Sequence, residues 1–137
     1  MTTTSTRSKP FSRTRKSVTD TTDDIRKLLK QYGAKNLAIR EEGENDEVVV
    51  LEFTLQDFRY RFAQAIPDDE AARRWRVFYN TIKADLIAMQ DEVFRIEERW
   101  LSNMVNPVTG ETVAEILRPQ LHEYRRMLAL PKGETDG

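Results

Sequence analysis

The chain has 137 residues, a formal net charge of -1 and no cysteine. This length fits one domain, which can bury a core of its own without a disulfide or a structural metal. The absence of cysteine excludes thiol chemistry and cysteine-rich zinc sites. No apolar run approaches the roughly 20 residues of a membrane helix, and the first residues lack the apolar stretch of a secretory signal. We therefore expect a cytoplasmic protein with no membrane partner.

Positive charge is concentrated at the start of the chain. Residues 1–19 contain five Lys or Arg residues and no acidic residue, so all 23 Asp and Glu residues lie further along. Phe11 and Val18 are the only bulky apolar residues after Met1 in this segment. Such a composition buries too little apolar surface to offset the entropy lost on ordering. The sequence predicts a disordered basic arm over residues 1–19, one domain over residues 20–130 and a disordered tail over residues 131–137.

A short helix is predicted at the start of the domain. Thr21 and Asp24 have the spacing of a capping box. The apolar residues that follow have the spacing of one buried helix face. They are Ile25, Leu28, Leu29 and Tyr32. Gly33 then ends the helix, because glycine readily adopts the left-handed conformation found after a C-cap.

Three stretches of alternating apolar residues follow the helix and predict an antiparallel meander. Their ranges are 37–40, 48–55 and 58–62. A two-residue turn at Gln56 and Asp57 joins the second and third strands. In this register Glu52 lies opposite Arg61, which suits a solvated outer face of the sheet.

The longest predicted element is one amphipathic helix. After Pro67 the sequence contains no Gly or Pro as far as Met104. Apolar residues recur at alternating steps of four and three, the heptad spacing of a coiled coil. They are Trp75, Tyr79, Ile82, Leu86, Met89, Val93, Ile96 and Trp100. At 1.5 Å per residue this helix would be about 50 Å long.

A further helix closes the domain. Thr112 and Glu115 have the spacing of a capping box, and Pro119 predicts a kink inside the helix. The apolar residues of this helix are Val113, Ile116, Leu117, Leu121, Tyr124 and Leu128. The predicted fold class is therefore α+β, with an N-terminal helix, a three-stranded antiparallel meander, one long amphipathic helix and a C-terminal Pro-kinked helix.

The predicted lengths do not match. A three-stranded sheet is about 15 Å wide, so a helix of about 50 Å overhangs it. The distal half of that helix carries two apolar stripes, and the last helix can cover only one of them. One interpretation is a long helix that kinks and folds against its own chain. The other is a homo-oligomer or a surface for another protein, whose candidate residues are Ile87, Phe94, Trp100, Leu101 and Met104.

The sequence offers no catalytic constellation. His122 is the single histidine, and it lies on a predicted helix, where a lone histidine is usually a surface or packing residue. No phosphate-binding glycine loop, nucleophile elbow or His-Glu metal helix is present. Acidic residues cluster over 41–47 and 68–70, but a solvated turn and the first turn of a helix explain them. We expect no enzyme activity, no cofactor and no metal.

The basic residues suggest nucleic acid as a partner. Arg76 and Lys83 share one face of the long helix and have no acidic residue four positions before them. The basic arm can neutralise phosphates, and its one aromatic residue can stack on a base. The candidate arm residues are Arg7, Lys9, Phe11, Arg13, Arg15 and Lys16. A solvated helix face and a solubilising tail without a ligand are the alternatives.

Short motifs in the middle of the chain resemble small bacteriophage and prophage proteins of unknown function. They are residues 28–34, 60–62, 74–76 and 82–84, with the sequences LLKQYGA, YRF, RWR and IKA. The resemblance spans about residues 25–120 and implies a phage setting but no mechanism. Our first hypothesis is a non-enzymatic nucleic-acid-associated accessory protein that uses the basic arm. The alternative is a protein-interaction or assembly module, a homo-oligomer through the long helix, with no role on nucleic acid.

Overall fold

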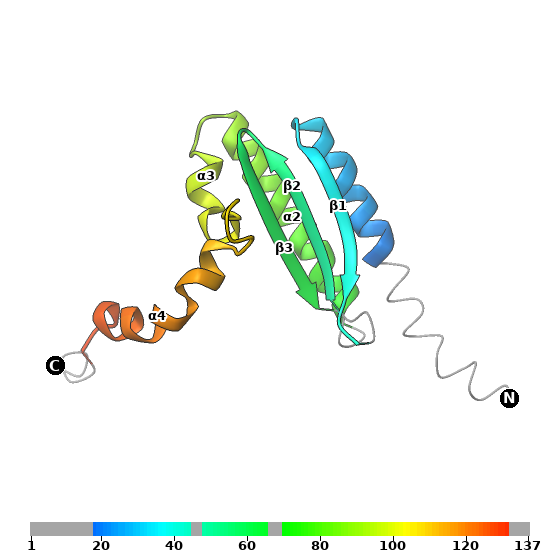
Figure 1. Ribbon diagram of the computed structural model, residues 1–137. Coiled ribbons are helices and arrows are strands. Elements are labelled where there is room, and N and C mark those ends of the chain that lie inside the picture. Colours follow the sequence, from blue (N-terminus) through cyan, green and yellow to red (C-terminus); the bar gives the residue numbers. More distant parts are fainter. Residues whose placement is uncertain (1–17, 45–47, 66–69, 132–137) are drawn as a thin grey trace, which may run out of the picture.

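The computed structural model describes residues 18–44, 48–65 and 70–131. An N-terminal helix over residues 18–31 precedes the first strand (Figure 1). The elements that follow are β1 (Lys35–Glu42), β2 (Val48–Leu55), β3 (Phe58–Ala65), α2 (Ala71–Gln90), α3 (Ile96–Arg99), the 3-10 helix η1 (Leu101–Asn103) and α4 (Val113–Leu128). The predicted α+β class is confirmed: a helix, a three-stranded antiparallel meander, a long helix and further helices.

The sheet has the predicted order and register. Its strands lie in the order β1-β2-β3 and are antiparallel throughout. Gln56 and Asp57 both have positive φ, 50° and 71°, as a two-residue hairpin turn requires. Glu52 lies opposite Arg61, and Leu55 opposite Phe58. The hairpin forms although neither turn residue is glycine, because the apolar faces of both strands agree on one register.

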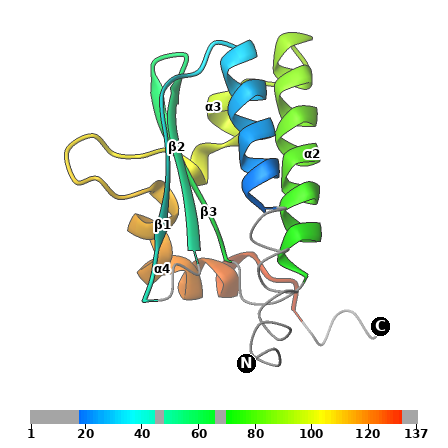
Figure 2. The same cartoon turned by 90° about the vertical axis from the view of Figure 1, so that its right-hand side faces the viewer.

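One face of the sheet is covered by two helices. The N-terminal helix (blue) and α2 lie side by side on the same side of the sheet (Figure 2). The predicted faces of these elements meet there, since Ile25, Leu29, Leu51, Phe53 and Leu86 are all at most 1% exposed. This two-layer arrangement of helices on a sheet holds the core of the domain.

The N-terminal helix begins earlier than predicted. Residues 18–20 are already helical, and Val18 is buried. Thr21 is therefore a buried residue inside the helix and does not cap it, and residues 18 and 19 belong to the domain and not to the arm. The predicted end of this helix is confirmed at Gly33, whose φ is 95°. The rest of the arm, and the tail after residue 131, lie outside the described residues.

The prediction of an unbroken helix to Met104 is wrong. α2 ends at Gln90, where the regular helical hydrogen-bond pattern stops. The Glu92 N–H donates to the Met89 carbonyl, and the Val93 N–H donates to the Ala88 carbonyl. These are the bonds of a Schellman-type helix end, which needs a left-handed residue. Glu92 supplies it, with φ of 59°. The helix thus stops without the glycine or proline that would mark the stop in the sequence.

The chain after α2 folds back onto the core. Trp100 follows α3 and is 3% exposed. Its ring lies edge-on to three aromatic rings of the sheet, those of Phe53, Tyr60 and Phe62, at centroid distances of 5.9, 5.4 and 5.2 Å. The indole Nε1 donates a 2.8 Å hydrogen bond to Asp85 of α2. The segment between α2 and α4 therefore folds onto the chain's own core instead of extending an overhanging helix.

The segment before α4 runs along the edge of β3. Tyr60 forms a bridge with Met104, and the Val105 N–H donates to the Arg59 carbonyl at 2.8 Å. Val105 in turn bridges Thr112, which starts α4. This short hairpin blocks part of an edge strand that would otherwise offer unpaired backbone groups. It also fixes where α4 begins relative to the sheet.

Candidate interaction surface

α4 presents an apolar stripe that the described chain does not cover. No residue of α4 is buried, and Figure 1 shows the helix running away from the sheet beyond β3. Leu117, Leu121 and Tyr124 are 37, 44 and 43% exposed, and Leu128 is 80% exposed. At 3.6 residues per turn these side chains share one face of the helix. The helix expected to cover others is itself uncovered.

The start of α4 is nevertheless firmly attached. The predicted capping box is confirmed: the Thr112 hydroxyl accepts from the Glu115 N–H at 3.2 Å, and the Glu115 carboxylate accepts from the Thr112 N–H at 3.2 Å. Glu115 also pairs with Arg61 of β3 at 3.3 Å. Hydrogen bonds from the Thr112 backbone and side chain lower the pKa of Glu115. The first turn of α4 is therefore held in a fixed orientation relative to the sheet.

Pro119 lies on the polar side of α4. It is two residues from both Leu117 and Leu121, a rotation of about 200° at 100° per residue. Its ring presses on the carbonyl four residues earlier, which opens the helix on the proline side. The bend visible in Figure 1 is thus expected to be concave toward the apolar stripe. Helices that cover a core usually curve in this sense.

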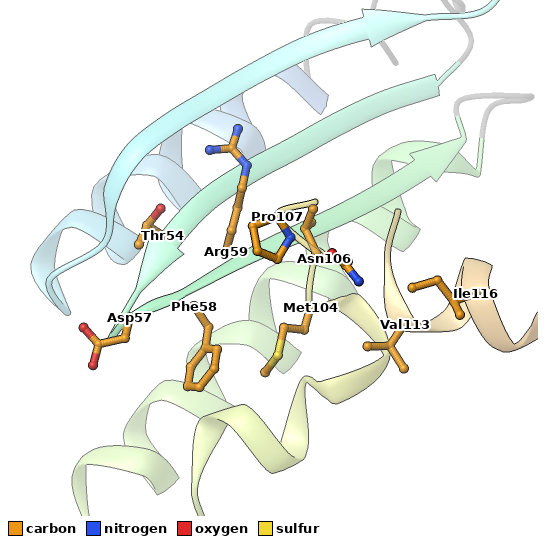
Figure 3. A pocket seen from close by; sticks show the side chains of 10 residues that line it. Thr54, Asp57, Phe58, Arg59, Met104, Asn106, Pro107, Val113 and Ile116 are labelled. Carbon is orange, nitrogen blue, oxygen red and sulfur yellow. The ribbon is translucent and has the colours of Figure 1, made fainter. Parts of the chain in front are cut away.

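A cavity lies at the root of α4, between the β2–β3 turn and the segment before the helix. Its volume is about 520 Å³. Figure 3 shows side chains from three parts of the chain around the same hollow. Its apolar lining consists of Phe58, Met104, Val105, Pro107, Val113 and Ile116. Thr54, Asp57, Arg59 and Asn106 provide the polar lining. The apolar stripe of α4 therefore continues into a pocket at its first turn.

The outer face of the sheet carries a cluster in which three arginines surround one glutamate. Glu52 is 4% exposed and accepts hydrogen bonds from Arg40, Arg59 and Arg61 at 2.6 to 2.8 Å. Burial alone would raise the pKa of Glu52, but the hydrogen bonds from the three guanidinium groups outweigh it and lower the pKa to about 2. Each arginine is held by this carboxylate, so the cluster is a structural element of the sheet.

The predicted nucleic-acid residues are only partly described. All six arm residues lie outside the described part of the chain. Arg76 pairs with Asp24 of the N-terminal helix at 3.4 Å, and its guanidinium lies 5.1 Å from the centre of the Tyr79 ring. Lys83 lines a groove between the N-terminal helix and α2, together with Lys27. Arg76 therefore pairs with a carboxylate from another helix, which the positions of acidic residues within α2 do not indicate.

The predicted partner-facing residues are dispersed. Ile87 and Leu101 are 41 and 51% exposed. Phe94 and Met104 pack partly against the core, and Met104 also lines the cavity at the root of α4. Trp100 is buried in the chain's own core. Because the helix that was to align them ends at Gln90, these five residues do not form one stripe.

Two features of this region are not among the predicted site residues. The periodicity of α4 predicts an apolar face, but nothing in it says what that face meets. Asp85 lies between Ile82 and Leu86 of the buried seam and is 7% exposed. A charged residue inside an apolar seam was the signal that a buried donor, here Trp100, lay nearby.

Comparisons with known proteins add no relative. No family model matches the chain, and neither the curated proteins nor the solved structures include a match to it. The resemblance to phage proteins stays a prediction. Among the described helices, none is both long enough and apolar enough to cross a membrane. Within the same residues, no group of three metal-ligating side chains is placed to hold an ion.

Proposed function

We propose that this chain is a protein-interaction module that assembles with a second copy of itself through α4. The observation that carries the proposal is a 16-residue amphipathic helix that buries no residue against the described chain. An isolated helix of this length is marginally stable in water, and helices in proteins owe most of their stability to packing of an apolar face. A partner that covers the stripe would supply that packing.

The exposed apolar surface is concentrated in one place. Seven of the 13 exposed large hydrophobic residues in the described chain lie between residues 116 and 130. Contiguous apolar patches of this kind are uncommon on monomers and mark interaction sites. Covering a leucine side chain completely stabilises by about 2 kcal/mol relative to leaving it in water. Burial of several such side chains therefore favours association.

A second copy is the partner best matched to this surface. An elongated apolar stripe needs an apolar surface of similar length, and α4 of another copy provides one. Paired identical patches form the isologous interface of a two-fold dimer, the commonest oligomer. The polar side of α4 carries both signs of charge, with Glu115 and Glu123 beside Arg118, Arg125 and Arg126. Such a mixed surface does not repel its own copy.

Solution mass tests the proposal. We expect the molar mass from light scattering to rise toward that of a dimer between roughly 1 and 100 µM, the range for a micromolar dissociation constant. The Leu121→Glu variant places a charge in the stripe and should remain monomeric. The matched control is His122→Glu, which puts the same side chain outside the stripe, about 100° round the helix from Leu121, and should behave as the wild type. A wild-type chain that stays monomeric throughout would refute the proposal.

A second candidate, binding of nucleic acid, is supported by the groove between the N-terminal helix and α2. Lys27 and Lys83 line it with Tyr32, Tyr79 and Asp24, and the Asp24 carboxylate pairs with Arg76. Neither lysine forms an ion pair with a described residue. Two cations beside two aromatic rings suit a phosphate backbone with a stacked base. The basic arm precedes the same helix in the chain and is the other proposed contact.

A salt-titrated gel shift tests this second candidate. If the five basic residues of the arm all engage duplex DNA, log affinity should fall with log salt at a slope of about -4.5. Deleting residues 1–16 should flatten the slope and leave Val18 in the core. Lys27→Ala combined with Lys83→Ala should weaken binding further. Binding that is absent, or independent of salt in both the full chain and the deletion, would remove the candidate.

A further inference from the structure

We infer that two copies of α4 pack antiparallel and that the leucine-rich end of each helix enters the cavity at the root of the other. This inference rests on the proposed self-association and adds its geometry. It assigns an occupant to the cavity between the β2–β3 turn and α4. It also gives a role to Leu128 and Leu130, which are 80 and 79% exposed in a single chain.

The spacing of the stripe suits an antiparallel pair. Leu117 and Tyr124 lie at nearly equal distances on either side of Leu121, and so do Val113 and Leu128. In an antiparallel pair whose two-fold axis passes beside Leu121, Leu117 of one copy faces Tyr124 of the other. Val113 faces Leu128 in the same way. Every layer along the contact is then apolar on both sides.

The cavity lies beside the first turn of α4, where the last turn of the second copy would lie in an antiparallel pair. Val113 and Ile116 of the first turn of α4 form one of its walls. In the antiparallel pair the last turn of the second copy lies beside this first turn, which brings its Leu128 and Leu130 to the mouth of the cavity. A volume of about 520 Å³ accommodates both leucine side chains. The apolar lining described above makes their burial favourable.

Charges at the two ends of α4 favour the same direction. Asp57 and Glu111 lie at the root end, and neither forms an ion pair with a described residue. Arg125 and Arg126 occupy the last turn. An antiparallel pair brings Arg125 and Arg126 of each copy to Asp57 and Glu111 of the other, while Arg59 at the root stays paired with Glu52. A parallel pair would place like charges at the same height.

The contact area separates the two directions. A helix of 16 residues is about 24 Å long and about 10 Å wide, so two stripes alone bury on the order of 500 Å². Stable specific interfaces bury roughly 1,200 Å² or more. An antiparallel pair gains further area by filling two cavities, whereas a parallel pair of the same helices fills neither. The antiparallel arrangement is therefore the one that approaches the size of a stable dimer.

Single cysteines can read the direction of the pair, because the natural chain contains none. Leu117→Cys and Tyr124→Cys chains, mixed and gently oxidised, should form mainly the mixed disulfide. Each variant alone should cross-link poorly. In a parallel pair each variant would instead cross-link efficiently to itself. His122→Cys, outside the apolar stripe, is the control for random collision and should give little disulfide in either arrangement.

A substitution at Leu130, just beyond the end of α4, tests whether the cavity is filled. Leu130→Asp should weaken the dimer about tenfold, the loss expected for one poorly buried leucine anchor. The control is Val108→Asp, since Val108 is 91% exposed on the loop before α4 and does not line the cavity. It should leave the dissociation constant unchanged.

The outcomes distinguish this inference from the proposed function. A wild-type chain that remains monomeric overturns both. A dimer with efficient Tyr124→Cys self-cross-linking overturns the antiparallel arrangement and leaves self-association standing. A dimer that shows the mixed disulfide but tolerates Leu130→Asp overturns the filling of the cavity alone.

Discussion

α2 and α4 are built on the same pattern and end in opposite situations. Both carry apolar residues at helical spacing. Trp75, Ile82 and Leu86 of α2 are at most 1% exposed, whereas α4 buries no residue. Amphipathic spacing therefore reports that a helix face will be covered, but not whether its own chain provides the cover. α2 meets the sheet, and α4 leaves its apolar face exposed in the described chain.

Removing one leucine from each helix gives the largest contrast. Leu86→Ala should lower the free energy of unfolding by about 4 kcal/mol, because it removes buried contacts and leaves a cavity. Leu121→Ala should cost less than about 0.5 kcal/mol in dilute, monomeric protein, since its site is already open to water. Urea unfolding of both variants measures the difference. A large loss for Leu121→Ala at low concentration would show that α4 is packed in the single chain.

The next largest effect is expected at low pH, where the ion pairs of Glu52 in the sheet are lost. The pKa of Glu52 is about 2 in the fold, against 4.5 ordinarily, so its contribution is complete above pH 4.5 and is lost as pH falls toward 2. By linkage this contribution is about 3 kcal/mol. The difference in unfolding free energy between wild type and Glu52→Gln should therefore shrink across that range. Glu42→Gln, an exposed partner of Arg40, should show little pH-dependent difference.

A buried hydrogen bond contributes to holding the segment between α2 and α4 against the core. Asp85→Ala leaves the buried Trp100 Nε1 without its 2.8 Å acceptor and should cost about 2 kcal/mol. Asp85→Asn keeps an acceptor oxygen and should cost less. Glu98→Ala, on the exposed side of α3, is the surface control. Equal losses for the Ala and Asn variants would mean that the charge near Arg99, and not the hydrogen bond to Trp100, holds this segment.

Much of the sheet and of the helix starts and ends was predictable, because the local sequence pattern and the final packing agree there. Alternating residues fixed which face of β2 meets the helices, and they fixed the pairing of Glu52 with Arg61 across the hairpin. Gly33 ended the first helix, and Thr112 capped α4, because each residue performs its role through its own backbone or side chain. In these places the local chemistry and the final packing require the same conformation.

The rest could not be predicted because it depends on residues distant in sequence. The carboxylate partner of Arg76 comes from another helix, and the burial of Trp100 depends on the sheet and on Asp85. The end of α2 gave no signal at all, since a glutamate occupies the left-handed position where glycine is usual. A heptad pattern that continues past such a residue resembles one long helix, and this is why the predicted stripe containing Phe94 and Leu101 does not exist.

The smallest expected effect tests that helix end directly. Glu92 has φ of 59°, a conformation that costs a residue with a Cβ roughly 1–2 kcal/mol, and glycine adopts it freely at a greater loss of chain entropy. Glu92→Gly should therefore stabilise the fold by about 0.5 kcal/mol, measured as a higher urea midpoint. Glu92→Ala keeps the Cβ and should give no such gain. If Glu92→Gly were destabilising, as glycine is inside a continuous helix, α2 would extend beyond Gln90, and the distinction drawn between the covered helix and the exposed one would have to be placed further along the chain.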